Sequence, residues 1–413
     1  MTSRHKSVST TDELIAALKD ADVDKIVVQG RLTSVPTLRL RSGLVLEGQD
    51  EQATLMFAID QDGLQLSTDN EVHHLSLETS VERRAIFNDT AVDSLGLIRL
   101  CNVVTVGMVQ LLARDKVRSG HVDINGLHVA AADARAQSDR PVGFGVKVIQ
   151  GAFTLWNMQA DDHVVISANL IGLSAGRATA PVLGSGIFVS GPGFGKGKLS
   201  VGRLETGPVY SDGCIPPGTP DVITGGVFTV HGAYVDTVRN LAAVVTYGVN
   251  DMVLDNWGQV DRWEAEAKIT SYGPSGIGFV NFGIVNELKV KAPIETFGLG
   301  ARGFNVYAGT VNLAEFDRIT THADGAVGVQ ISQPIGQLKV FRGIETFGAT
   351  GESLVKGVVM TLSAIGLSIK PGGSAREIVI AGGIITHGKG IAPLEVLGEL
   401  GALHITGATR AVN

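Results

Sequence analysis

Hydrophobic positions along this chain follow a helical spacing only once, near the start. Thr10-x-x-Glu13 has the form of a capping box, and apolar residues follow it at helical intervals from Leu14 to Leu18. This pattern predicts one helix over residues 10–20. Beyond it, short runs rich in Val, Ile and Leu are separated by Gly, Asn or Asp. Such runs are typical of strands in a sandwich, a barrel or a solenoid.

One hydrophobic motif recurs at a constant interval in the C-terminal half. It reads apolar-x-Ser/Thr-aromatic-Gly, with His and Ala as occasional substitutes, and starts at positions 244, 269, 294, 319, 344 and 384. The interval is 25 residues four times and then 40. A second column keeps the same spacing: Leu288, Leu313, Leu338, Ile378 and Leu403. Both columns therefore place an insertion of about 15 residues between Glu352 and Gly366.

A fixed period of about 25 residues without a helix in each repeat predicts three short strands per coil of a parallel β-helix. Sandwiches and barrels need no such period, and propeller blades need ~40 residues or more. We therefore expect an all-β, right-handed, single-stranded parallel β-helix with a short N-terminal capping helix. Its parts are a cap over 1–30, less regular coils over 31–221, and regular coils over 222–413 with an insertion at 352–366.

Composition narrows the function classes. Glycine accounts for 53 of 413 residues, and hydrophobic residues for 44%, which excludes general disorder. A net charge of -7 without a basic cluster argues against a nucleic-acid partner. The longest apolar stretch, 357–369, is too short for a membrane span, and no signal peptide is seen, so we expect a cytoplasmic protein without a membrane partner. Cys101 and Cys214 form no disulfide framework, and the scattered histidines predict neither a metal site nor a cofactor.

The N-terminal segments carry a resemblance. Residues 8–18, 25–30 and 44–49 resemble the cap of pectate-lyase-like right-handed β-helix proteins. The resemblance implies a right-handed coil whose first turn is covered by the helix. Members of that superfamily act on polysaccharides or serve as tailspikes, adhesins and structural rods, so the resemblance implies no single activity.

The recurring motif also supplies candidate site residues. If its first residue faces the core, its second and fourth positions face outward. Glu295 and Glu345 occupy the second position two coils apart, which separates their backbones by ~9.6 Å, near the ~6.5–9.5 Å between the carboxyls of inverting glycosidases. Rings at the fourth position would stack on sugars: Tyr247, Tyr272, Phe297 and His322. The alternative is a purely structural ladder in which each coil matches the next.

A second candidate is the segment 254–266. Trp257 and Trp263 lie there beside Asp255 and Asp261, and tryptophan with carboxylates is a common composition of sugar sites. We expect the two indoles to be partly exposed on one face with the acids. The alternative is a loop whose tryptophans cover the flank of a coil.

A third candidate is Asp161-Asp162, followed by Gly184-Ser185-Gly186. This pattern is similar to polygalacturonase-type glycoside hydrolases, in which an Asp-Asp pair precedes Gly-His-Gly. The resemblance implies that Asp161 and Asp162 form an acid/base pair. Ser185 stands in place of the histidine, and an Asp-Asp turn between two strands is the alternative.

Together these residues favour a carbohydrate-active protein, a glycoside hydrolase or transglycosylase that uses two carboxylates on an oligosaccharide or polysaccharide. The alternative is a non-enzymatic scaffold, structural or glycan-binding, that self-associates into a homo-oligomer. Polar residues of both signs in a cleft under the predicted loop 207–221 would favour the enzyme, and flat, uniform faces would favour the scaffold.

Overall fold

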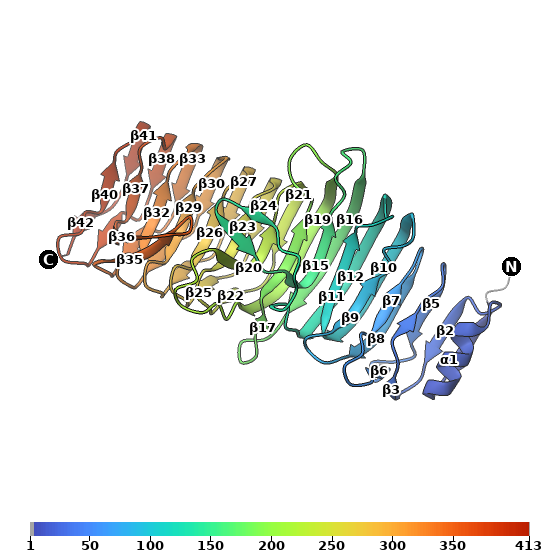
Figure 1. Cartoon of the computed structure of the whole chain (residues 1–413). Helices are drawn as coiled ribbons and strands as arrows, with labels where there is room; N and C mark the ends of the chain where they lie inside the picture. The colour runs from blue at the N-terminus through green and yellow to red at the C-terminus, as the bar shows by residue number, and fades with distance from the viewer. Residues whose placement is uncertain (1–3, 413) are drawn as a thin grey trace.

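The computed structural model describes residues 4–412 and shows a rod of coiled strands, with the only helix of this range at one end (Figure 1). Each turn of the coil gives one strand to each of three parallel stacks. The first and second stacks form a 25-stranded sheet, and the third lies in a 15-stranded sheet. This is the parallel β-helix that the 25-residue period predicts. No helix in the described range is long and apolar enough to cross a membrane.

The regular coils occupy the C-terminal half. Their first-stack strands are β21 (Ala233–Asn240), β24 (Gln259–Ala265), β27 (Ile284–Val290), β30 (Thr310–Phe316), β33 (Pro334–Val340), β38 (Ser374–Ile380) and β41 (Glu399–Ile405). The second stack contains β22 (Val244–Thr246), β25 (Ile269–Ser271), β28 (Ile294–Thr296), β31 (Ile319–Thr321), β34 (Ile344–Thr346), β39 (Ile384–Thr386) and β42 (Thr409–Ala411). The third contains β20 (Val222–Thr229), β23 (Asp251–Asn256), β26 (Ile277–Asn281), β29 (Arg302–Val306), β32 (Val327–Ile331), β37 (Leu367–Ile369) and β40 (Leu394–Val396).

In the N-terminal half, several strands run through both the first and second stacks. They bend at residues with positive φ, such as Asn102, Gly126 and Gly172. The strands of this half that lie in the 25-stranded sheet are β1 (His5–Val8), β2 (Lys25–Val28), β3 (Arg31–Val35), β5 (Val45–Gly48), β6 (Thr54–Phe57), β8 (Glu71–Glu78), β10 (Ser94–Val106), β12 (Ser119–Ala131), β16 (Val165–Ala175), β17 (Val182–Leu183) and β19 (Lys198–Asp212). Those in the third stack are β4 (Leu38–Arg39), β7 (Leu64–Leu66), β9 (Arg84–Asn88), β11 (Met108–Ala113), β15 (Gly151–Asn157) and β18 (Ser185–Ser190). Because β19 extends to Asp212, the predicted loop 207–221 is wrong in its first part, and only the segment after Asp212 is a loop.

The helix α1 (Thr11–Lys19) has the predicted capping box. The Glu13 backbone N–H donates to the Thr10 side chain at 3.2 Å, and the Glu13 carboxylate accepts from the Thr10 backbone N–H. Leu14 and Ala17 are fully buried and belong to the main hydrophobic core. The helix therefore packs its apolar face against the first coil.

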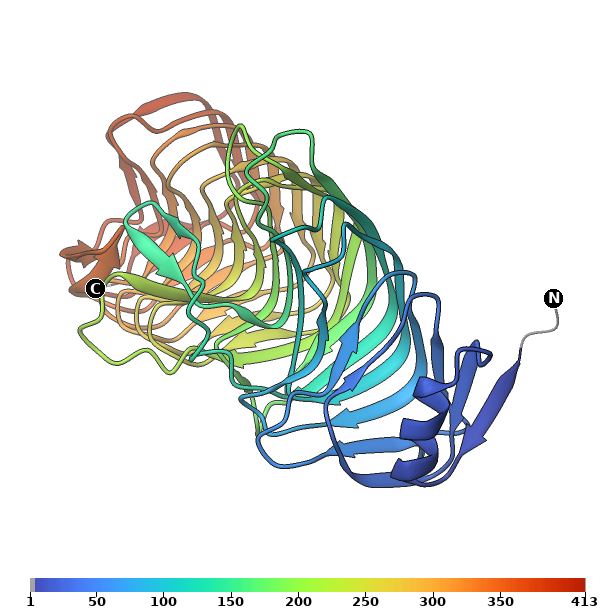
Figure 2. The same cartoon turned by 45° about the vertical axis from the view of Figure 1, so that its right-hand side comes forward.

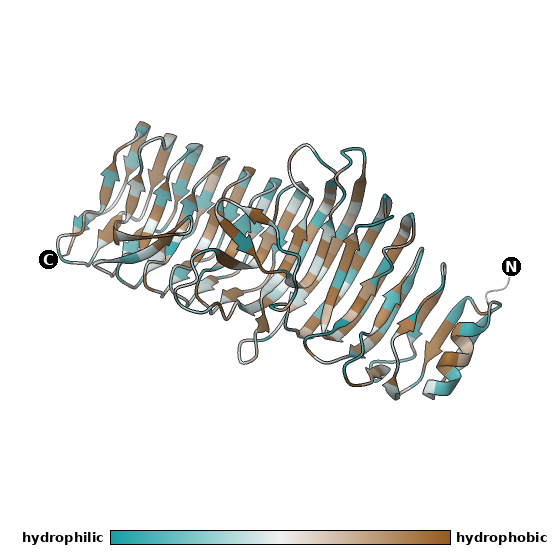
Figure 3. Ribbon diagram, in the orientation of Figure 1, coloured by the Kyte–Doolittle hydropathy of each residue, from teal (hydrophilic) through white to brown (hydrophobic). Residues whose placement is uncertain are grey.

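Isoleucine columns line the inside of the coil. Ile269, Ile294, Ile319 and Ile344 pair successively along the second stack and are almost fully buried. Hydrophobic and hydrophilic residues alternate along the strands of the first stack (Figure 3), so one face of each strand fills the core and the other faces outward.

The second predicted column is wrong at Leu313. Ala314, and not Leu313, pairs with Leu288 and with Leu338. The turn that contains Gly309 is one residue longer than its counterparts, and the turn before Ile319 is one residue shorter. The strand β30 is thus displaced by one residue, and the second stack regains its register at Ile319.

Two hairpins interrupt the coils. The first is β13 (Val142–Gly143) with β14 (Val146–Val148), and the second is β35 (Thr350–Val355) with β36 (Val358–Ser363). The second hairpin is the insertion that the period predicts between Glu352 and Gly366, and it leaves the coil as one excursion. Both hairpins lie on the same flank of the rod (Figure 2).

Candidate functional site

The aromatic column lies on the outside of the second stack, as the alternation of the motif predicts. Neighbouring rings are 4.3–5.4 Å apart between centroids with interplanar angles of 1–12°. Each ring therefore covers the faces of its neighbours and presents its edge to solvent. The column contains Tyr247, Tyr272, Phe297, His322, Phe347 and His387. Because sugars stack on ring faces, this geometry favours the structural ladder over a row of sugar platforms.

The two glutamates of the motif lie beside this column. His322 Nε2 is 2.9 Å from a carboxylate oxygen of Glu295, and His387 Nε2 is 2.9 Å from one of Glu345. Lys268 also forms an ion pair with Glu295. Partial burial raises the pKa of Glu295, but the hydrogen bonds and charges of Lys268 and His322 outweigh burial and lower this pKa. A carboxylate with a lowered pKa is a poor general acid near neutral pH.

The acids of the segment 254–266 do not form a groove with Glu295. Asp255 lies in the third stack, Asp261 in the first and Glu295 in the second, so they occupy three different faces of the coil. Asp261 is exposed and accepts a hydrogen bond of 2.7 Å from Asn286.

The predicted exposure of the two tryptophans is wrong. Trp263 points into the coil, where its ring packs edge-on against Phe279 and its Nε1 donates to Asn240 at 2.8 Å. Trp257 is also fully buried, beneath Phe144 of the first hairpin. Trp263 sits at a core position of β24, since it pairs with Leu288, so it has no surface for a ligand.

Asp161 and Asp162 lie in an exposed turn before β16. Both carboxylates are near His163, with distances of 3.1 and 2.9 Å to its Nδ1. In the described range, these three residues are the only group of at least three possible metal-ligating side chains this close together, and all three are exposed. Ser185 is buried in β18, where its hydroxyl donates to the carbonyl of Ile149. The two aspartates thus fit the alternative, an Asp-Asp turn between strands.

A second hydrophobic core covers the outside of the third stack. It includes Phe188, Phe228, Met252 and Trp257, and it is separate from the core inside the coil. The hairpins β13–β14 and β35–β36 lie over it like a roof. We call the space under them the roofed cavity.

The roof is made from two turns of the same kind. Phe144 and Gly145 have φ of 51° and 85°, and Lys356 and Gly357 have φ of 48° and 80°. Positive φ at both central residues is the pattern of a type I′ turn, which suits the twist of a two-residue hairpin. Phe144 and Lys356 are unusual in such a turn, where Asn, Asp or Gly is favoured. Both side chains line the roofed cavity.

The two turns touch at their tips. A Cβ added to Gly145 would lie 3.4 Å from the carbonyl oxygen of Lys356, and one added to Gly357 would lie 3.5 Å from that of Gly145. Within residues 4–412, no hydrogen bond joins the two hairpins. The roof therefore consists of two separate hairpins whose tips are in van der Waals contact.

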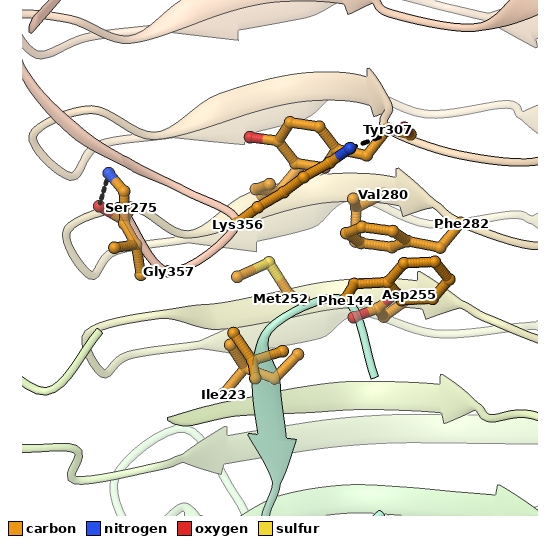
Figure 4. A pocket seen from close by; sticks show the side chains of 13 residues that line it. Phe144, Ile223, Met252, Asp255, Ser275, Val280, Phe282, Tyr307, Lys356 and Gly357 are labelled. Atoms are coloured by element: carbon orange, nitrogen blue, oxygen red, sulfur yellow. Dashed lines mark hydrogen bonds between the residues drawn. The ribbon is translucent and has the colours of Figure 1, made fainter. Parts of the chain in front are cut away.

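The roofed cavity measures about 40 Å³ and is mainly apolar (Figure 4). A water needs about 10–15 Å³ of such space, so the cavity has room for a few waters or a small organic group. Its walls include Met252, Val280, Phe282 and Tyr307, and the carboxyl of Asp255 lies among them. Neither oxygen of this fully buried carboxyl has a hydrogen-bond partner, and burial raises its pKa well above the usual value.

A larger groove borders the roofed cavity. It measures about 260 Å³ and lies between the loop 217–220 and β35. Ser275 and Leu354 line both spaces. Prolines, valines and leucines predominate in the groove, and Glu352 is its one charged residue. The mixture of both charge signs that would favour an enzyme is thus not present under the loop.

Sequence reasoning singled out Asp255 and Trp257 but missed Phe144, Lys356 and Tyr307. The dipeptides Phe144-Gly145 and Lys356-Gly357 carry a weak turn signal, since Gly follows at the second turn position. Nothing in the sequence indicates that two hairpins so distant along the chain meet over one strand.

Comparisons with known proteins give no further guide. No protein-family model matches this chain, and neither a curated protein nor a solved structure matches it at a significant level. What the chain can do must therefore be argued from its own geometry.

Proposed function

We propose that this protein is a non-catalytic β-helical scaffold. The observation that carries the proposal is the placement of Asp255, Asp261 and Glu295 on three different faces of the coil. Hydrolysis by two carboxylates needs both groups on one bond, within about 10 Å of each other. The exposed candidates are engaged by neighbouring side chains instead.

The outer face of the first stack supports the same proposal. Its charges form ion pairs from one coil to the next: Arg239 with Glu264 and Glu266, Lys291 with the same two glutamates, and Lys289 and Lys339 with Glu315. Each such surface pair contributes only about 0–1 kcal/mol. Their effect is to make the face flat and nearly neutral, which suits a rod better than a polysaccharide groove.

A scaffold needs a surface for assembly, and the second hairpin offers one. Val358, Val359 and Met360 on β36 are 60%, 59% and 47% exposed. Adjacent exposed apolar side chains of this kind are typical of contact surfaces between proteins. A second copy of this chain, giving a homo-oligomer, is the partner that we propose for this surface.

The cap supports a place in the pectate-lyase-like superfamily, since its helix covers the first coil as the resemblance implies. Within that group a two-carboxylate hydrolase is the second candidate. One observation favours it: Glu295 and Glu345 share one face, and each is held by a histidine.

Turnover of a broad oligosaccharide panel separates the two functions. We expect no hydrolysis by the wild type, and a concentration-dependent increase in mass by light scattering that Val359→Asp abolishes. Hydrolysis that is lost in Glu295→Gln and retained in Asp261→Asn would overturn the scaffold. A monomer at all concentrations would refute the assembly surface.

A further inference from the structure

Arg302 is a fully buried positive charge without an ion pair to any described residue, and it lies beside the roofed cavity. Its side chain is fully buried at the start of β29, directly next to the cavity-lining Ile277 of β26. The guanidinium donates to the Ser353 hydroxyl at 2.7 Å and to the Leu354 carbonyl at 3.3 Å. Its Nε has no partner, and no ion pair with a described carboxylate is formed. Buried charges are usually paired, because an unpaired one is costly to desolvate.

A second cation reaches the same place from the roof. Lys356 extends from the hairpin tip across the cavity, and its Nζ donates to the Tyr307 carbonyl at 3.2 Å (Figure 4). The ammonium lies 5.4 Å from the Tyr307 ring centroid, and the Arg302 guanidinium lies 5.7 Å from it. Two positive charges therefore lie near one ring, and their hydrogen-bond acceptors are neutral oxygens.

The remaining polar groups around the cavity also lack acceptors. The Tyr307 hydroxyl and the Trp257 Nε1 are buried without a hydrogen-bond partner. The Asp255 carboxyl is fully buried with neither oxygen hydrogen-bonded to a described residue, and burial raises its pKa well above the usual value, which favours the protonated form. A protonated carboxyl donates one hydrogen bond. These donors, together with two cations that form no ion pair within the described range, make an anionic acceptor the best match for the cavity.

We propose that the roofed cavity binds a small monocarboxylate with a short apolar group. The carboxylate would face Lys356 and accept from the Asp255 hydroxyl, with the charge of Arg302 acting from behind the cavity wall. The apolar group would lie among Met252, Val280 and Phe282. Two cations would repel an organic ammonium ion of the same size. The site is independent of the scaffold role, since it lies under the hairpins rather than on their outer face.

Entry to this site requires the two hairpin tips to part and the Lys356 ammonium to leave the Tyr307 carbonyl. Phe144 and Lys356 hold positive φ at the hairpin tips although their side chains disfavour it. Each residue places a wall of the cavity directly above the strand that carries Asp255. The tip of the second hairpin can move without breaking a strand pairing of the coil, because β35 pairs only with β36. Ser353 and Leu354 stay hydrogen-bonded to Arg302 and hold the base of this hairpin to the coil.

The test is calorimetric titration of the full chain with three probes of matched shape: propionate, propylammonium and 1-propanol. We expect binding of propionate alone. Lys356→Gln should weaken it several-fold, since it removes a positive charge next to the carboxylate; Lys356 is itself exposed, so part of that attraction is screened by water. Lys389→Gln, which removes an exposed lysine outside the cavity, is the matched control and should leave the affinity unchanged.

Further variants at Lys356 and Asp255 distinguish a loss of binding from a loss of folding. Lys356→Gly suits the turn and should fold normally, yet it should lose propionate binding. Asp255→Asn retains a donor and should bind within a few-fold of the wild type, whereas Asp255→Leu should not bind. The proposal is overturned if propionate fails to bind at millimolar concentration, if propylammonium binds as well, or if Lys389→Gln weakens binding as much as Lys356→Gln.

Discussion

Replacement of Asp255 by Asn should change how the stability of the rod depends on pH. The carboxyl is fully buried among apolar side chains, and burial raises its pKa well above the usual value. Between the unfolded pKa of about 3.9 and the folded pKa, the folded state keeps a proton that the unfolded state has released. Asp255 therefore makes the protein more stable at low pH, and this contribution is lost as the pH rises through that window.

The magnitude follows from proton linkage. One proton bound only in the folded state changes the free energy of unfolding by about 1.4 kcal/mol per pH unit. The wild type should thus lose up to about 1.4 kcal/mol per pH unit from this residue within that window. Asp251 adds a change of the same sign, because its burial raises its pKa to about 7 against three hydrogen-bond donors. Asp255→Asn removes only the first contribution.

Urea denaturation at pH 5 and pH 6, followed by circular dichroism, measures both free energies. The pH-dependent loss should be smaller in Asp255→Asn than in the wild type, by up to about 1.4 kcal/mol over this pH unit. Asp261→Asn, on the open face of β24, controls for the removal of one negative charge. An unchanged pH dependence in Asp255→Asn would show that the carboxyl is hydrated or paired in solution and would refute the reasoning.

Three other outcomes are expected. Trp263→Ala should lower the free energy of unfolding by about 3–5 kcal/mol in the same denaturation assay, because the indole fills the coil core. Tyr272 is a half-exposed ring of the ladder, so Tyr272→Ala should lower the free energy of unfolding by less than half as much. Deletion of 350–363 should leave the circular dichroism spectrum of the coil intact, since Ile344 pairs with Ile384 across the insertion, and loss of all strand signal would contradict this. Glu295→Gln should lower the melting temperature by only a few degrees, because its ion pairs are partly exposed, and a large drop would be inconsistent with that placement.

The fold was predictable because its constraint is periodic. Each coil must repeat the positions of the previous one, so Ile269, Ile294 and Ile319 report the architecture directly. The capping box was equally readable, since Thr10 and Glu13 interact within one helical turn. The Leu313 column failed because an alanine can fill the same place in the core, and hydrophobicity alone favoured the leucine.

The candidate site was much less predictable. Trp263 and Trp257 are close in sequence, but the turn between them sends one into the coil and the other beneath the roof. The residues that close the cavity over Asp255 come from hairpins far away along the chain, and no local pattern reports a contact between Phe144 and Trp257. Periodicity describes the coil, whereas the roofed cavity depends on the two segments that leave it.

The one-residue displacement of β30 has a consequence for engineering. An added residue in the turn at Gly309 is compensated by a missing residue before Ile319, so the one-residue displacement does not continue into later coils. The register is therefore set anew at each second-stack strand, as the pairing of Ile344 with Ile384 across the second hairpin also shows. Duplication of the unit 319–343 should yield a rod that is longer by one strand spacing, ~4.8 Å, with the ladder continued by one extra His322 ring. The length of the rod could then be chosen in steps of one coil.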